Sequence, residues 1–198
     1  MSTVDSPGPN RLHLGCGKKI IPGWINLDVV AGEGVDVVAA LDRCADVPLP
    51  FEADSIDEFI GSHLLEHIRN VLPLMQELHR IAKPGAKAHF TTPYGSSDDA
   101  YEDPTHIRLY FMDSFGYFSQ PYYWRADYGY NGDWLTEHIT LKVSKSRHQG
   151  RAANDIYDEV MRLRNVVIEM TARLIAVKPI REPKKELQVA PSLEILLV

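Results

Sequence analysis

Short apolar runs separated by turns dominate the first half of the chain, and this alternation is typical of parallel α/β units. We predict strands at residues 12–14, 24–28, 35–39, 56–61 and 86–91. Residues 64–82 carry apolar side chains at close to helical spacing, and Pro73 inside them predicts two short helices or a restart near Asn70. Residues 11–92 are therefore predicted to be the α/β, ligand-binding half of the chain.

The remaining sequence divides into two segments of different character. Residues 93–134 hold most of the aromatic side chains, and an irregular connection this long is usually functional, although single rings can equally belong to a satellite core. In residues 135–198 we predict strands at 135–144 and 193–198, with an amphipathic helix at 155–177 inserted between them. The apolar stripe of that helix would cover a binding cleft or form a homodimer contact, and we favour the homodimer.

Composition limits the kind of partner. The 198 residues fit one domain, and 27 acidic against 21 basic residues give a net charge of -6, which disfavours binding to nucleic acid. Cys16 and Cys44 are too few for a disulfide framework and fit a reducing compartment. Residues 1–10 lack a signal pattern, and no apolar stretch is long enough to span a membrane. We predict a cytoplasmic protein with no membrane partner that acts on a small molecule.

A glycine turn follows the first predicted strand. Gly15-Cys16-Gly17 would let a ligand approach the backbone closely, although an ordinary tight turn has the same pattern. A dinucleotide site would need a third glycine near position 20, where Ile20 stands. Asp28 ends the second strand, where a doubly wound sheet places an acid for ribose hydroxyls. The alternative for Asp28 is a strand-end cap.

Further motifs follow in order along the chain. An acidic loop from Asp42 precedes Leu49-Pro50-Phe51 and Ser55-Ile56-Asp57, and Ser62-His63-Leu64-Leu65-Glu66-His67 comes after the fourth strand. Over roughly residues 11–111 this arrangement resembles class I S-adenosylmethionine-dependent methyltransferases of the small-molecule type with a Gly-Cys-Gly motif. The resemblance implies a Rossmann-like, doubly wound, mostly parallel seven-stranded sheet. Its last strand, 193–198 here, would be inserted antiparallel.

The resemblance also implies the cofactor, S-adenosyl-L-methionine, and the residues that bind it. Asp28 would hold the ribose hydroxyls and the Leu41-Asp42 turn the adenine. The methionine part and the sulfonium would lie beside Leu14, Gly15, Cys16, Gly17 and His63. Two positions depart from the family pattern: His13 stands where an acid is common, and Lys19 where a third glycine is common.

The acceptor side is predicted after the fifth strand. Asp103-Pro104-Thr105-His106-Ile107-Arg108, followed by an aromatic pair, resembles a motif of methyltransferases that act on small molecules, sugars included. Methyl transfer to an alcohol needs a positioned nucleophile and a base. We predict His106 as the base with Asp103 orienting it, and acceptor contacts from Arg108, Tyr94, Tyr110 and His67. Alternatively, His106 and Asp103 only brace the loop.

Two competing functions and one metal alternative remain open. His13 and Lys19 favour a non-catalytic methyltransferase-like scaffold or partner subunit, whereas the glycine turn and Asp28 oppose it. An N-methyltransferase acting on protein or nucleic acid is disfavoured by the acidic charge and by Thr92-Pro93-Tyr94, which lacks the Asn/Asp-Pro-Pro-aromatic pattern. No cysteine and histidine spacing suggests zinc, so no metal site is predicted, although magnesium would suit Asp98, Asp99 and Asp103.

Overall fold

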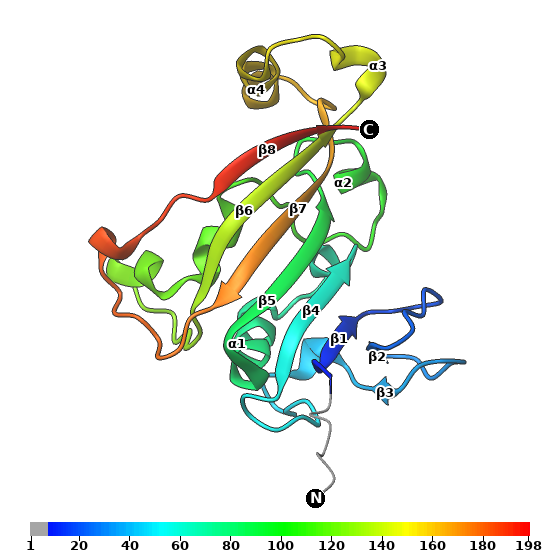
Figure 1. Ribbon diagram of the computed structural model, residues 1–198, viewed down its shortest axis with the longest axis vertical. Helices are drawn as coiled ribbons and strands as arrows, with labels where there is room; N and C mark the ends of the chain where they lie inside the picture. The colour runs from blue at the N-terminus through cyan, green and yellow to red at the C-terminus, as the bar shows by residue number, and fades with distance from the viewer. Residues whose placement is uncertain (1–7) are drawn as a thin grey trace, which may run out of the picture.

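One eight-stranded sheet organises the chain in the computed structural model, which describes residues 8–198 (Figure 1). Residues 1–7, which are part of the stretch 1–10 predicted to lack a signal pattern, lie outside the described residues. The strands are β1 (Arg11–Leu14), β2 (Ile25–Asp28), β3 (Val37–Val38), β4 (Ile56–Ser62), β5 (Ala82–Pro93), β6 (Trp134–Val143), β7 (Val167–Ala176) and β8 (Ser192–Leu197). Their order across the sheet is β3-β2-β1-β4-β5-β7-β6-β8.

All the strands except β7 run in the same direction. β1 pairs in parallel with β2 and β4, β2 with β3, and β4 with β5. β7 lies antiparallel between β5 and β6, and β8 pairs in parallel with β6 at the edge. The predicted α/β fold with a mostly parallel sheet and one inserted antiparallel strand is confirmed, but the sheet has eight strands instead of seven.

The identity of the inserted strand was predicted wrongly. Residues 193–198 were expected to be antiparallel, but β8 is an added parallel edge strand. The helix predicted at 155–177 ends early, because α4 (Ala153–Arg162) is followed by β7. Buried residues alternate along β7, and Met170, Ala172 and Leu174 point into the core. Most of the apolar residues that were predicted to form a homodimer contact are therefore buried in the sheet, which removes the basis of the homodimer prediction.

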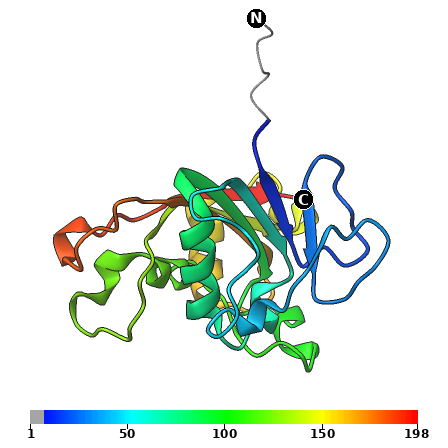
Figure 2. The same cartoon turned by 90° about the horizontal axis from the view of Figure 1, so that it is seen from below.

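The core lies between one face of the sheet and helix α1 (Val71–Ile81), as Figure 2 shows. Trp134 is fully buried there, packs edge-on against Phe59 and donates its indole N–H to the Met75 carbonyl at 2.9 Å. The predicted restart near Asn70 is confirmed, because the single turn η2 (Leu65–His67) precedes α1. Proline within the first turn of a helix removes no intrahelical hydrogen bond, which explains why Pro73 is tolerated.

The opposite face of the central strands is polar and half exposed. Cross-strand ion pairs cover it, including His89 with Glu58 at 3.7 Å and Arg173 with Glu137 at 2.6 Å. The Arg173–Glu137 pair lies between the antiparallel strands β6 and β7, a pairing that allows a solvated face, whereas the His89–Glu58 pair joins the parallel strands β4 and β5. The connections from β1 to β2 and from β2 to β3 are turns without helices.

The segment between β5 and β6 is irregular and contains three of the six remaining short helices. These are α2 (Asp99–Glu102), η3 (Ser114–Phe118) and η4 (Gln120–Trp124), while η1 (Leu41–Arg43), α3 (Lys145–His148) and η5 (Lys185–Leu187) lie elsewhere. The fully buried Asp133 anchors this segment, because it pairs with Arg181 at 2.7 Å and accepts from the Gln120 N–H. Among the described residues, no helix is both long and apolar enough to cross a membrane.

Candidate functional site

The carboxyl ends of β1, β2 and β4 enclose a cavity of about 330 Å³. Parallel strands bring their carboxyl ends to one edge, where ligands bind in open α/β sheets. The volume lies in the range of small-molecule sites. Its lining includes four of the residues predicted to bind a cofactor, and the full set is Gly15, Asp28, Val29, Ala39, Ala40, Leu41, Asp42, Leu64, His67 and Ile68.

The glycine turn at this cavity requires glycine at both positions. Gly15 has φ +60° and Gly17 has φ +51°, a conformation that side chains disfavour. At Gly15 a Cβ atom would also lie 2.9 Å from Leu64 Cδ1, whereas at Gly17 it would meet no described atom within 4 Å. The first glycine therefore serves both the turn and the close packing of the loop after β4.

Replacing Gly15 with alanine should lower the free energy of unfolding by more than the same change at Gly17. The left-handed conformation costs about 1–2 kcal/mol at either position, and Gly15→Ala adds the contact with Leu64. Thermal unfolding of both variants measures the difference. Equal losses at the two positions would contradict the packing role of Gly15.

Two carboxylates at the cavity are held by backbone N–H groups. Asp28 accepts from Gly17 at 2.8 Å and from Val30 at 3.0 Å, and Asp42 accepts from Arg69 at 2.7 Å. Burial raises the pKa of Asp28, but the backbone N–H groups outweigh it and lower the pKa overall. Asp28 is therefore an ionised cap, and its carboxylate keeps lone pairs for ligand hydroxyls.

Other predicted cofactor residues contribute less than expected. Leu14 is fully buried in the core and Cys16 is buried, and neither lines the cavity. The Cys16 N–H donates to the Leu27 carbonyl at 3.0 Å, which fixes the turn. His13 is also buried, with Nδ1 3.1 Å from the Asn26 side-chain oxygen. His13, which stands where an acid is common in the family, thus links β1 to β2 through its contact with Asn26.

His63 lies at the end of β4 but outside the cavity lining. Its φ is +51°, an uncommon conformation outside glycine. Nε2 lies 3.2 Å from Glu169 and Nδ1 3.4 Å from Glu66. The imidazole therefore links the edge of the sheet to two carboxylates.

The predicted acceptor motif folds directly over the loop after β4. We call the contact between residues 65–69 and 105–110 the clasp. The Ile107 N–H donates to the Glu66 carbonyl at 2.9 Å, and Arg108 donates to the carbonyls of Ile68 and Arg69 at 3.0 and 2.6 Å. The Arg108 guanidinium, predicted to hold the acceptor, is largely occupied in the clasp.

The clasp brings together two histidines and a buried acid. The His67 and His106 rings meet edge to face with centroids 4.8 Å apart. Asp103, predicted to orient His106, lies 3.8 Å from its Nε2 and accepts the Thr105 hydroxyl at 2.6 Å. His67, in contrast to the buried His106 side chain, lines the cavity at the carboxyl edge. Sequence reasoning thus placed both histidines near the site but could not tell which one faces the cavity.

Sequence reasoning missed Glu66, which is buried at the centre of this group. The residue is 1% exposed, and burial raises the pKa of its carboxyl, partly offset by its own backbone N–H and by His63, His67 and His106. The sequence signal that could have identified Glu66 is its position between two histidines, His63 three residues before it and His67 directly after it. Asp98, Asp99 and Asp103, the alternative magnesium ligands, do not form a cluster, and Asp98 pairs with Arg164 at 2.5 Å. Among residues 8–198, the potential metal ligands that lie at suitable distances from one another are Glu66, His67 and His106.

The aromatic residues proposed for the acceptor are mostly structural. Tyr94 and Tyr110 are buried, and the Tyr110 hydroxyl donates to the Leu65 carbonyl at 3.3 Å. A groove of about 590 Å³ lies beside them, with Ile107, Arg108 and Tyr110 from the clasp in its wall. Its other rings are Phe111, Tyr117, Phe118, Tyr123 and Tyr128. One loop of the clasp, with His67 and Ile68, lines the cavity at the carboxyl edge, and the other loop, residues 107–110, lines this aromatic groove.

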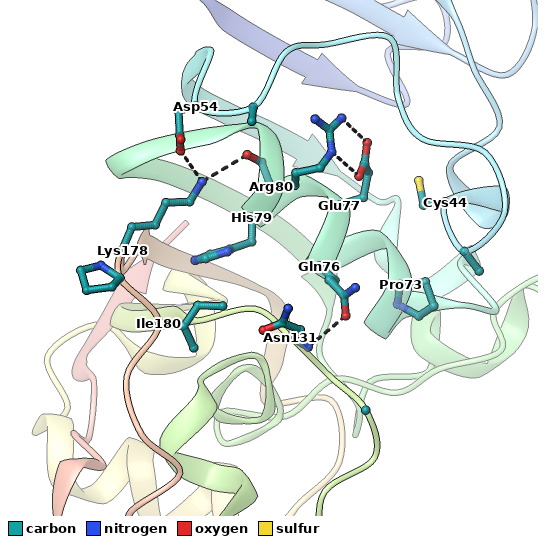
Figure 3. Close-up of a pocket in the computed structure, with 14 residues that line it drawn as sticks. Cys44, Asp54, Pro73, Gln76, Glu77, His79, Arg80, Asn131, Lys178 and Ile180 are labelled. Atoms are coloured by element: carbon teal, nitrogen blue, oxygen red, sulfur yellow. Dashed lines mark hydrogen bonds and ion pairs between the residues drawn. The ribbon is translucent and has the colours of Figure 1, made fainter.

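A larger cavity of about 720 Å³ lies beside helix α1, the loop before β4 and the segment after β7 (Figure 3). None of the predicted site residues lines it. Asp54, before β4, pairs there with Lys178, after β7, at 2.5 Å. Glu77 is paired with Arg80 at 2.7 Å. These charges satisfy one another, so the cavity offers less free chemistry than the carboxyl edge.

Comparison with known proteins finds one family model that matches part of the chain. Residues 12–90 match the methyltransferase domain family. A methyltransferase from Archaeoglobus fulgidus described as S-adenosylmethionine-dependent has a TM-score of 0.51 at 15% identity, with 85% of this chain and 86% of that chain covered. A similarly described protein from Aquifex aeolicus has a TM-score of 0.52 at 14% identity, covering 86% and 83%.

A further solved structure of the same fold is the [4+2]-cyclase SpnF, with a TM-score of 0.53 at 12% identity and 86% and 76% covered. The search of curated proteins found no match to the sequence of this chain. At these identities the solved structures establish the Rossmann-like methyltransferase fold alone, since one fold can carry several functions.

Proposed function

We propose that this chain, an S-adenosylmethionine-dependent methyltransferase, transfers the methyl group of S-adenosyl-L-methionine to an oxygen of a small polar acceptor. The observation that carries the proposal is the cavity at the carboxyl edge, where Gly15, Asp28 and Asp42 lie together with His67. Each of the first three was predicted from the sequence to bind the cofactor.

The acceptor is proposed to bind beside the clasp. The two loops of the clasp lie between the aromatic groove and the cavity proposed for the cofactor, because residues 107–110 line the groove and His67 and Ile68 line the cavity. Exposed ring faces in the groove suit the apolar faces of a carbohydrate as well as an aromatic alcohol. The net charge of -6 favours an uncharged or cationic acceptor over a phosphate-rich one. In-line transfer requires the acceptor oxygen close to the methyl carbon, on the side away from sulfur.

The acceptor proton is proposed to pass to the histidine pair of the clasp. Imidazole is the side chain whose ordinary pKa suits proton transfer near neutral pH. Asp103 supports both rings, through Thr105 to His67 and across 3.8 Å to His106. Catalytic contacts are often long before the substrate binds, so this spacing is compatible with the role.

Replacing Asp28 with alanine should weaken S-adenosyl-L-methionine binding about 10–100-fold, because charge-assisted hydrogen bonds to the ribose are worth roughly 1.5–3 kcal/mol. Calorimetric titration measures the affinity. Asp28→Asn keeps an acceptor for the Gly17 N–H and separates the loss of charge from the loss of the cap.

Asp57→Ala is the matched control, since Asp57 also accepts a backbone N–H, from Asn10 at 2.8 Å, but lies at the start of β4. Unchanged affinity in the Asp28 variants would make Asp28 a cap only. No cofactor binding by the wild type would favour the alternative of a non-catalytic scaffold.

A further inference from the structure

The group formed by Glu66, His67 and His106 has the composition of a metal site. One ligand atom from each residue lies within 4.8 Å of the other two. Two of the residues come from the loop after β4 and one from the loop after β5, and the clasp holds these loops together. Two imidazoles and one carboxylate are a recurrent ligand set for catalytic zinc and related divalent ions.

Three buried polar atoms of this group, both carboxylate oxygens of Glu66 and Nδ1 of His106, have no hydrogen-bond partner among the described residues. Among residues 8–198 no hydrogen bond reaches either carboxylate oxygen of Glu66, and the His63 Nδ1 lies 3.4 Å from Oε1 without the geometry of one. The His106 side chain is 7% exposed, and its Nδ1 is likewise buried without a described partner. Buried carboxylates are normally hydrogen-bonded, paired or bound to metal, so two free oxygens here point to a missing ligand.

The surrounding contacts fix the histidine protons in the arrangement that a metal needs. Thr105 has one hydroxyl proton, and the Asp103 carboxylate takes it at 2.6 Å. The Thr105 oxygen must therefore accept from His67 Nδ1, 3.0 Å away, which leaves Nε2 of His67 with a free lone pair. Asp103 also lies 3.8 Å from His106 Nε2 and favours the proton there, so Nδ1 is left free. Carboxylate support of this kind is typical of metal-binding histidines.

We propose that Glu66, His67 and His106 bind one divalent transition-metal ion of the zinc type. Two neutral imidazoles suit such an ion better than magnesium, which prefers oxygen ligands. Ligand atoms bound to zinc lie about 2.0–2.2 Å from the ion, so binding draws the three side chains closer together. Three protein ligands leave a coordination position open.

The open position gives the site a role that rests on the proposed function. His67 also lines the cavity proposed for the cofactor, so an ion at this place would lie at the wall of that cavity. A divalent ion that binds the acceptor hydroxyl lowers the pKa of that hydroxyl and orients it. The ion would then replace His106 as the group that activates the acceptor, and His106 would act as a ligand.

Metal binding can be measured without knowing the acceptor. Tag-free full-length protein is first dialysed against a chelator and then titrated with Co²⁺, whose visible spectrum reports coordination by nitrogen and oxygen ligands, and Zn²⁺ is added in competition. We expect one equivalent of Co²⁺ to bind and Zn²⁺ to displace it. Glu66→Gln should weaken Co²⁺ binding about 100-fold or more, and Thr105→Val, which removes the outer support, about 10–100-fold.

Glu194→Gln is the matched control, because Glu194 also faces a histidine, His138 at 3.3 Å, but on the exposed edge of the sheet. Its Co²⁺ affinity should equal that of the wild type. Glu66→Gln should keep or raise the thermal stability of the metal-free protein, since it removes a buried carboxylate that accepts no hydrogen bond from the described residues. This separates loss of the site from loss of the fold.

Absence of saturable Co²⁺ binding, or equal affinity in the wild type and Glu66→Gln, would overturn the site. Calorimetric titration with S-adenosyl-L-methionine tests the proposed function separately. Cofactor binding without metal binding would refute the metal site alone, and metal binding without cofactor binding would refute the proposed function alone.

Discussion

His106→Ala is expected to lower the rate of methyl transfer about 10²–10⁴-fold, the usual contribution of a positioned acid or base. The affinity for S-adenosyl-L-methionine should remain nearly unchanged, because His106 does not line the cofactor cavity. The acceptor for this assay is found by screening small hydroxylated compounds for release of S-adenosylhomocysteine. His106→Gln should not restore the rate, because an amide cannot take the proton.

The matched control is His89→Ala. His89 also lies at a similar distance from a carboxylate, 3.7 Å from Glu58, but on the polar face of the sheet. Asp103→Asn should cost less than His106→Ala, since it disturbs only the orientation of the rings. Near-normal turnover of His106→Ala would remove His106 from the chemistry and leave the loop-brace interpretation.

Glu66→Gln separates the two roles of His106 in the same assay. A histidine that acts only as a base should retain most of its rate when the neighbouring carboxylate becomes an amide. A metal ligand should lose the rate together with Co²⁺ binding.

Arg181→Leu is expected to have the largest effect on stability. Asp133 is fully buried, and Arg181 reaches both of its oxygens, each at 2.7 Å. Removing one partner of a buried pair leaves an uncompensated charge and costs about 3–5 kcal/mol. For a chain of this length that corresponds to a drop of roughly 6–20 °C in Tm.

Arg173→Leu provides the comparison for this loss. Its pair with Glu137 is equally short at 2.6 Å but is exposed, so its removal should cost only about 0–1 kcal/mol. The double variant Asp133→Leu with Arg181→Leu should recover part of the loss, because no charge then remains buried. Similar Tm values for Arg181→Leu and Arg173→Leu would contradict the anchoring role of Asp133.

Local signals correctly predicted the first half of the chain. Apolar runs bounded by turns gave β1 to β5 in order, and Pro73 marked the break before α1. The turn glycines and Asp28 were identifiable because left-handed backbone and strand-end carboxylates have strong residue preferences. These are constraints that a few neighbouring residues impose by themselves.

The C-terminal third shows where local patterns fail. Val167, Met170 and Leu174 fit a helical stripe, yet Met170, Ala172 and Leu174 equally fit the two-residue period of a strand. Pairing with β5 on one side and β6 on the other decided for the strand, because it satisfies the backbone on both edges. No window of neighbouring residues contains that information.

The sequence by itself determined the α/β class, the glycine turn and the acid at the end of the second strand, since each depends on residues close together in the chain. Only the tertiary structure decided that β7 is a strand, that Arg108 and Tyr110 serve the clasp, and that His106 lies beside Glu66 and His67. The physical reason is distance along the chain. About forty residues separate these groups, and only the parallel alignment of β4 and β5 brings the ends of the two strands, and the loops that follow them, to the same edge.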